Sequence, residues 1–296
     1  MFVVYWHNIL PDSIGVWNDA LPRITLEEFE KQIGWIARHF EPWPLAEVLN
    51  YRDDRISSKR RLAITFDDGF RGVHEFALPV LKKFGWTGSV FILNQFEETD
   101  PSQNLMHSEI LEILFRITRE PVYLNHRLGS DPEKRLAYGA EKIHLRPLTP
   151  QERTEFCHRA SKILKVSMDE VREFAANHPT TYSKLNLKEQ QDLVSQDWTL
   201  GAHTTHHPRL TTLSPTQQES EIGPSENYRR SGSPRIFAYP YGDFDSQSAS
   251  VVESLGFDAA FTTKPYPIQQ TDNPFQLPRM SFGSLWNRAM RYARQR

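Results

Sequence analysis

Two short segments of the sequence carry residues that could bind one metal ion together. Asp67 and Asp68 stand side by side in the segment TFDDG, and two such carboxylates without a cation would repel each other. The segment HTTHH supplies His203 and His207 four residues apart, a spacing that places both imidazoles on one side of a helical turn while His206 points elsewhere. One carboxylate and two neutral imidazoles hold a tetrahedral divalent ion and leave its fourth position open for water. The two segments together predict a catalytic metal centre.

The residues around such a centre would divide the proton transfers between them. If one of the paired aspartates binds the ion, the other can take a proton from the water as a general base. His7 follows the first apolar run and is the candidate proton donor for the leaving group. Each feature also has a simpler explanation: TFDDG as a turn or helix cap, HTTHH as a polar loop, and His7 as a hydrogen-bonded histidine near a barrel mouth. Their occurrence in one chain favours the metal site.

The elements that must position these residues alternate between β-rich runs and helix-like stretches, which is the pattern of βα units around a parallel sheet. The expected strands cover 2–6, 62–66, 87–93, 198–203, 235–240 and 259–263, with a last short segment at 276–282. The expected helices cover 25–40 and 75–85, with one more after the segment LSPTQQESEI (213–222) and one around 248–256. In a parallel α/β barrel every strand ends at the same rim, so His7, Asp67 and His203 would meet there.

Residues 100–185 interrupt this alternation. The section contains helix-like pieces such as SEILEILFRI and SMDEVREFAANH but no convincing strand, and it carries many charges and scattered prolines. We expect a helical insertion between barrel strands, placed where it could cap the site, rather than a separate domain. Residues 1–296 would then form a single catalytic domain.

Composition narrows the classes of function. A chain of 296 residues can build one large α/β domain, and its formal net charge of -2 offers no basic excess for binding nucleic acid. The single cysteine, Cys157, is expected to be a buried small side chain rather than a nucleophile. No apolar run is long enough to span a membrane, and the N-terminal segment lacks the basic region of a signal peptide. We therefore expect a cytoplasmic protein.

Three motifs resemble those of a known family, the polysaccharide deacetylases, also called the NodB homology domain or carbohydrate esterase family 4. TFDDG is similar to the first family motif, HTTHH fits the second, and FAYPYG resembles the third. The resemblance implies a distorted (β/α) barrel and metal-dependent hydrolysis of the acetamide group on an N-acetylated sugar. It implies Asp67 as the base, with Asp68, His203 and His207 as metal ligands. It also implies that the backbone N–H of Tyr241 helps to hold the oxyanion.

The chain departs from the usual family layout at two places. It has no C-terminal LxHD-like motif, but its YWH start is similar to the YH start of a rearranged branch that includes the biofilm poly-N-acetylglucosamine deacetylases. That branch implies His7 as the general acid. The third motif lacks the usual arginine, so Arg279 in LPRM is the candidate cation that keeps Asp67 ionised, with an ordinary surface arginine as the alternative. The resemblance covers roughly residues 1–99 and 185–282.

The predicted function is hydrolytic removal of N-acetyl groups from an N-acetylated amino sugar in a polysaccharide or glycan precursor. The expected ion is zinc, with cobalt, nickel or manganese as alternatives. Trp6, Tyr239 and Tyr241 could stack on sugar rings or simply pack. Two alternatives stay open: a deacylase of a lipid-linked sugar, a small amino sugar or a non-sugar amide, and a non-catalytic carbohydrate-binding module.

Overall fold

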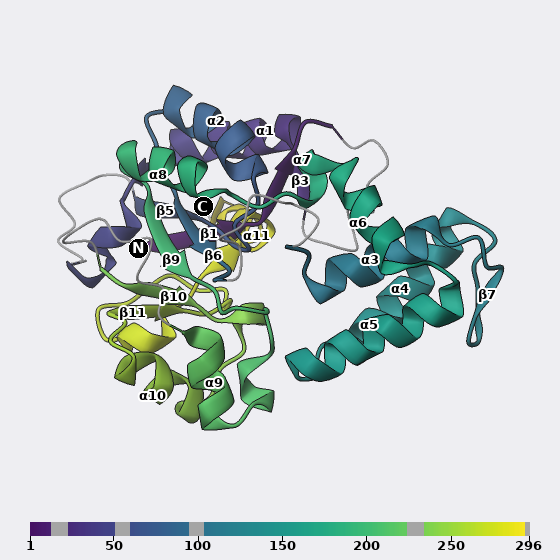
Figure 1. Cartoon of the computed structure of the whole chain (residues 1–296). Helices are drawn as coiled ribbons and strands as arrows, with labels where there is room; N and C mark the ends of the chain where they lie inside the picture. The colour runs from purple at the N-terminus through teal and green to yellow at the C-terminus, as the bar shows by residue number, and fades with distance from the viewer. Residues whose placement is uncertain (13–22, 51–59, 95–103, 224–233, 294–296) are drawn as a thin grey trace.

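A curled parallel sheet forms the centre of the chain (Figure 1). The computed structural model describes residues 1–12, 23–50, 60–94, 104–223 and 234–293. The strands follow the order β11-β10-β9-β6-β5-β1-β12, and β4 pairs with β5. Their bounds are β1 Phe2–Trp6, β4 Phe40–Pro42, β5 Arg60–Phe66, β6 Ser89–Ile92, β9 Thr199–Ala202, β10 Ile236–Ala238, β11 Ala259–Phe261 and β12 Met280–Ser281.

The segment from Leu277 to Ser281 joins the two ends of this sheet. Leu277 forms a parallel bridge with Phe261 at the end of β11, and three residues later Met280 pairs with Val4 of β1. All pairs along the main sheet are parallel. The expected distorted (β/α) barrel is confirmed. All strand ends point the same way, so the residues that follow the strands gather at one rim.

Helices and short turns surround the barrel (Figure 1). The helices are α1 Leu26–His39, α2 Leu78–Lys83, α8 Leu187–Ser195, α9 Pro215–Ile222, α10 Ser246–Ser254 and α11 Phe282–Ala293. A π-helical turn, η2 Val73–Ala77, leads directly into α2, and short 3-10 turns cover η1 Leu45–Asn50, η4 Leu210–Thr212, η6 Pro240–Gly242 and η7 Pro274–Gln276. Beside the barrel, β2 Asn8–Leu10 pairs with β3 Arg23–Thr25. Among the described residues, no helix is both long and apolar enough to cross a membrane.

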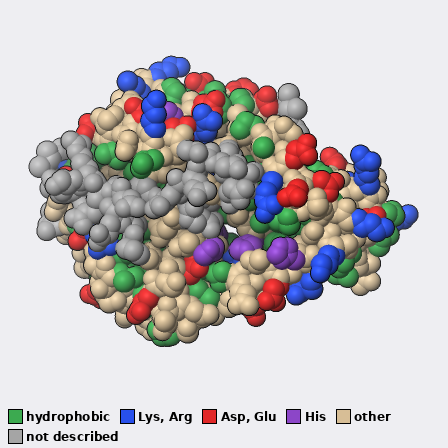
Figure 2. Space-filling view, viewed as in Figure 1, with side chains coloured by type: hydrophobic (Ala, Val, Ile, Leu, Met, Phe, Trp, Pro, Cys, Tyr) green, Lys and Arg blue, Asp and Glu red, His purple; other side chains and the backbone are tan. Residues whose placement is uncertain are grey.

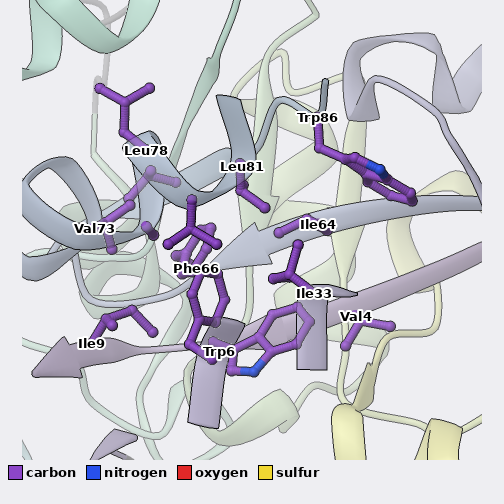
Figure 3. Close-up of a cluster of buried hydrophobic side chains, with 14 of the residues drawn as sticks. Val4, Trp6, Ile9, Ile33, Ile64, Phe66, Val73, Leu78, Leu81 and Trp86 are labelled. Atoms are coloured by element: carbon purple, nitrogen blue, oxygen red, sulfur yellow. The ribbon is translucent and has the colours of Figure 1, made fainter. Parts of the chain in front are cut away.

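One face of the sheet packs against α1 and α2 through a large apolar cluster (Figure 3). The helix α1 begins after Thr25, whose hydroxyl accepts a hydrogen bond from the Glu28 N–H, and it buries Phe29 and Ile33 completely. Trp6 packs edge-on against the Phe29 ring and donates its indole N–H to Gln32. Full burial of side chains of this size contributes about 1.5 to 3 kcal/mol each. This cluster fixes the strands β1 and β5 from which the site residues emerge.

The helical insertion forms a lobe beside the barrel, to the right in Figure 1. Its helices are α3 His107–Ile117, α4 Asp131–Leu145, α5 Pro150–Leu164, α6 Met168–Ala176 and α7 Pro179–Tyr182. They enclose an apolar cluster of their own, which includes Leu111, Tyr138 and Cys157. The expectation that this section has no strand is wrong in one detail, because β7 Val122–Tyr123 and β8 His126–Arg127 form a small antiparallel hairpin. The pairing spans only two residues on each side, which is too short for an alternating pattern to reveal it.

Two buried ion pairs join the lobe to the barrel. Arg23 of β3 binds both carboxylate oxygens of Glu112 on α3, at 2.9 and 3.0 Å. Lys184, at the end of the insertion where it bridges to Phe70 of the barrel, donates to both oxygens of Glu109 on the same helix, at 2.7 and 2.9 Å. Buried charges are tolerated only when they are paired in this way, so these contacts fix the orientation of α3 against the barrel.

Candidate active site

A carboxylate and two imidazoles meet at the rim of the barrel. The ligand atoms of Asp68, His203 and His207 all lie within 4.8 Å of one another. The Nε2 atoms of His203 and His207 are 3.5 and 3.4 Å from the same carboxylate oxygen, Oδ1 of Asp68. That oxygen is buried and accepts no hydrogen bond within the described structure. A buried carboxylate oxygen left in this state is costly, and a cation bound between the three groups would satisfy it.

The two histidines differ in protonation. The ring of His203 is fixed by a contact of 2.7 Å between its Nδ1 and the carbonyl of Ala238, which accepts the Nδ1 proton and turns Nε2 toward Asp68. Burial would lower the pKa of His203, but the carboxylates of Asp68 and Asp67 outweigh it and raise that pKa, so a bound cation would replace the Nε2 proton. Burial lowers the pKa of His207 to about 3, against the opposing effect of Asp68, so its imidazole is neutral. A neutral imidazole is the form that binds a metal ion.

The second motif reaches this geometry through a loop and not through a helical turn. The expectation of a helical turn is therefore wrong. Thr204 and His207 adopt left-handed backbone conformations, with φ of 68° and 54°, and the Thr204 hydroxyl accepts a hydrogen bond from the His207 N–H at 3.1 Å. His206 points away as expected and binds Glu221 through its Nδ1 at 2.7 Å. The loop brings the two imidazoles together, with their ring centres 5.0 Å apart.

Asp67 lies beside the triad of Asp68, His203 and His207 but has a different partner. The Arg279 guanidinium donates to both of its carboxylate oxygens, at 2.7 and 2.8 Å. Arg279 is fully buried and also donates to the Thr262 carbonyl and the Thr65 hydroxyl, so it is not a surface arginine. Burial alone would raise the pKa of Asp67, but Arg279 and His203 outweigh it and hold that pKa below its ordinary value. Asp67 is therefore a carboxylate at neutral pH.

Two turns hold the first and third motifs in place. After β5 ends, Asp68 and Gly69 both have positive φ, 69° and 65°, so the chain reverses at once and both aspartates face the rim. In the third motif Tyr241 and Gly242 also have positive φ, 61° and 73°. A side chain at Gly242 would collide with Thr263, so only glycine fits there.

A cavity of about 180 Å³ opens beside these groups. His7 and Tyr241 line it together with Asp68, His203 and His207. Burial lowers the pKa of His7, although Asp68 and Asp67 oppose that effect. In Figure 2 a row of histidine side chains borders the hollow between the barrel and the helical lobe. All seven residues singled out from the sequence therefore meet in one region, six of them in the cavity wall and Arg279 behind Asp67.

The structure adds residues that the sequence did not reveal. Tyr5 lines the cavity two positions before His7, and period-two alternation along a strand could have predicted it. Residues Met106, Ser108, Lys142, Arg146 and Thr263 also line it. Four of these five belong to the insertion or to the segment that leads into it, where no motif marks them.

Other candidates from the sequence lie in the core. Trp6 and Tyr239 are 5% and 0% exposed, so they pack and do not present a face to a sugar. Cys157 is buried in the helical lobe, and burial raises its pKa to about 12. A thiol in this state is not a nucleophile. Of the three aromatic residues considered for stacking, only Tyr241 lines the cavity.

Comparison with known sequences matches part of the chain to one family model. The family model described as polysaccharide deacetylase matches residues 156–260, a range that contains the second and third motifs. YxkH of Bacillus subtilis, whose assignment as a polysaccharide deacetylase is itself provisional, is 20% identical over 265 residues. That match covers 87% of this chain and 65% of YxkH, so the chain spans just under two thirds of that relative.

Solved structures give the same fold. The Streptococcus pyogenes deacetylase PplD, solved in complex with acetate, superposes with a TM-score of 0.59 at 15% identity and covers 97% of this chain and 96% of its own. IcaB from Ammonifex degensii gives a TM-score of 0.55 at 17% identity, with coverage of 96% and 94%. The resemblance to polysaccharide deacetylases and the barrel fold expected from it are confirmed.

Proposed function

We propose that this chain is a metal-dependent deacetylase that hydrolyses the acetamide group of an N-acetylated amino sugar in a polysaccharide or glycan precursor. The observation that carries the proposal is the pair of adjacent aspartates in two different states. Asp68 faces two imidazole nitrogens, whereas Asp67 is held as a carboxylate by Arg279. One acid is thus equipped to bind a cation and its neighbour to accept a proton, which are the two functions that amide hydrolysis at a metal centre requires.

The triad Asp68, His203 and His207 would hold the divalent ion. Such an ion polarises the amide carbonyl and makes water easier to deprotonate. Zinc suits one carboxylate and two imidazoles, and cobalt, nickel or manganese could replace it. Asp67 would take the proton from the attacking water, since its bidentate contact with Arg279 fixes its orientation and keeps it ionised.

His7 and Tyr241 would complete the reaction. His7 lines the same cavity and would give a proton to the leaving nitrogen. The backbone N–H of Tyr241 would donate to the oxyanion from a turn that Gly242 holds in place. The products are acetate and a free amino sugar.

Release of acetate tests this function. Chitooligosaccharides, peptidoglycan fragments and poly-N-acetylglucosamine would each be incubated with metal-free and zinc-loaded protein. We expect acetate from at least one of these glycans, only with the loaded protein. A protein that binds one equivalent of metal but is inactive on all three would favour a non-sugar amide or a lipid-linked sugar as the substrate. A protein that binds no metal would favour a carbohydrate-binding module.

A further inference from the structure

The helical insertion contributes two cations to the cavity, and the proposed reaction uses neither of them. Lys142 lies in the last turn of α4 and Arg146 is the C-cap residue of that helix, so the two side chains are one turn apart on the same face. Both line the cavity that also contains the triad. Basic residues at a helix C-terminus offset the helix dipole, but that effect does not require them to face a cavity.

Two contacts place the end of α4 beside the triad. The carbon atom at the centre of its guanidinium is 5.5 Å from the centre of the Tyr241 ring, and that ring packs edge-on against His207 at 4.7 Å. The buried side chain of Arg153 donates to the carbonyls of Arg146 and His207, at 2.7 Å in each case. The Arg153 guanidinium thus links the C-terminal end of α4 to the loop that carries His207, a proposed metal ligand.

The charges around the cavity favour an anion on the side that Lys142 and Arg146 form. Asp67 is neutralised by Arg279, and a divalent ion at the triad would more than offset Asp68. Among the described residues of the cavity wall, Lys142 and Arg146 then add two positively charged side chains. Two such charges attract a negatively charged substrate, and the low dielectric of a partly buried site strengthens the attraction.

We propose that Lys142 and Arg146 form an anion subsite, which binds a phosphate or carboxylate group of the N-acetylated sugar whose acetamide meets the triad. The inference rests on the proposed deacetylase function and narrows its substrate to an anionic glycan. Guanidinium and ammonium groups both bind phosphate and carboxylate oxygens through charge-assisted hydrogen bonds.

The ionisation of Lys142 gives the subsite a pH dependence. Burial, together with Arg146, lowers the pKa of Lys142 to about 8, so this cation loses its proton between neutral and alkaline pH. Preference for an anionic substrate should therefore fall as the pH rises through that value. The charged groups that act on Lys142 are Arg146 on its own helix, Glu112 on α3, Asp68 after β5 and Arg23 on β3.

The test compares one neutral and two anionic probes. The zinc-loaded protein would be assayed on N-acetylglucosamine, N-acetylglucosamine 1-phosphate and N-acetylmuramic acid, which separate a phosphate from a carboxylate. We expect a higher kcat/KM for at least one anionic probe, and a loss of about tenfold in that preference in Lys142→Gln or Arg146→Gln. Added salt should weaken the preference too. Lys162→Gln, which removes an exposed charge of α5 outside the cavity, should leave the preference unchanged.

Calorimetric binding of the same probes separates this inference from the proposed function. If no probe is hydrolysed, the deacetylase proposal fails for these sugars, while tighter binding of an anionic probe that depends on Lys142 and Arg146 would still support the subsite. Equal binding of neutral and anionic probes overturns the subsite. Tighter binding of the anionic probe that persists in both Lys142→Gln and Arg146→Gln also overturns the subsite, because the metal alone would then bind the anion. Arg146 is exposed, so Arg146→Gln keeps the test valid even if Lys142→Gln folds poorly.

Discussion

Arg279 holds Asp67 by both carboxylate oxygens, although 212 residues separate the two in sequence. Arg279 comes just before the short strand β12, and Asp67 follows β5; both of these strands pair with β1. The guanidinium lies against the rings of Tyr5 and Phe91 in the barrel interior. Arg279 thus belongs to the core of the barrel and directly contacts Asp67, the candidate base.

Removal of the cation from this pair should destabilise the fold as well as the site. Arg279→Met leaves Asp67 buried without a partner, which should lower the free energy of unfolding by about 3 to 5 kcal/mol. Chemical denaturation measures this loss. The double variant with Asp67→Asn should recover part of the stability and none of the turnover. Full activity in Arg279→Met would show that Asp67 needs no cation.

Substitution of the base alone should separate chemistry from metal binding. Asp67→Asn preserves the shape of the side chain but removes the proton acceptor, so kcat should fall by about 100- to 10,000-fold. Zinc content, measured by elemental analysis, should stay at one equivalent. An unchanged rate would exclude Asp67 as the base.

The metal-binding triad can be tested with a control from the same motif. His203→Ala or Asp68→Ala should abolish tight zinc binding and activity together, because each removes one of the three candidate ligands found among the described residues. His206→Ala should retain both, since His206 binds Glu221 instead. Chelation of the wild type should abolish activity and added zinc should restore it. Equal zinc affinity in the His203 and His206 variants would contradict the assignment.

His7 should affect turnover more than metal binding. His7→Ala removes the proposed proton donor, so kcat should fall by about 100-fold or more while zinc affinity changes little. Single-turnover assays with substrates of different leaving-group basicity provide a second readout, because loss of an acid harms the poorest leaving groups most. A uniform loss for all leaving groups would reassign His7 to a structural role.

Cys157 should be inert in the folded protein. Burial raises the pKa of its thiol to about 12, so at pH 8 far less of it is thiolate than in an unfolded chain, where the pKa is about 8.5. Reaction with a thiol reagent at pH 8 should therefore be at least about 100-fold slower for the native protein than in denaturant. Cys157→Ala should keep full activity, and rapid native labelling would contradict the buried position.

The ion pair between Lys184 and Glu109 should anchor the helical insertion. Lys184→Met leaves Glu109 buried without its cation and should cost about 3 to 5 kcal/mol in unfolding free energy. The double variant with Glu109→Gln should lose less unfolding free energy. Its glutamine can still accept the hydrogen bond that the Met106 N–H donates to Glu109 at 2.8 Å. If the single and double variants have the same free energy of unfolding, the ion pair does not anchor the insertion.

The sequence by itself determined the features that depend on local pattern. Alternating β-rich and helical runs predicted βα units around a parallel sheet, and the motifs TFDDG and HTTHH predicted which acid and imidazole side chains converge. These predictions succeeded because strand direction alone brings the ends of parallel strands to one rim. The same patterns could not show that HTTHH forms a loop with left-handed residues, because spacing alone does not specify backbone conformation.

Only the tertiary structure decided what surrounds that centre. The contact of Arg279 with Asp67 depends on how the last strand closes the barrel, and the sequence offered an exposed arginine as an equal alternative. Lys142 and Arg146 resemble the ordinary basic end of a helix until the lobe folds against the rim. Such contacts arise from packing between distant elements, and packing has no period in the sequence that could reveal it.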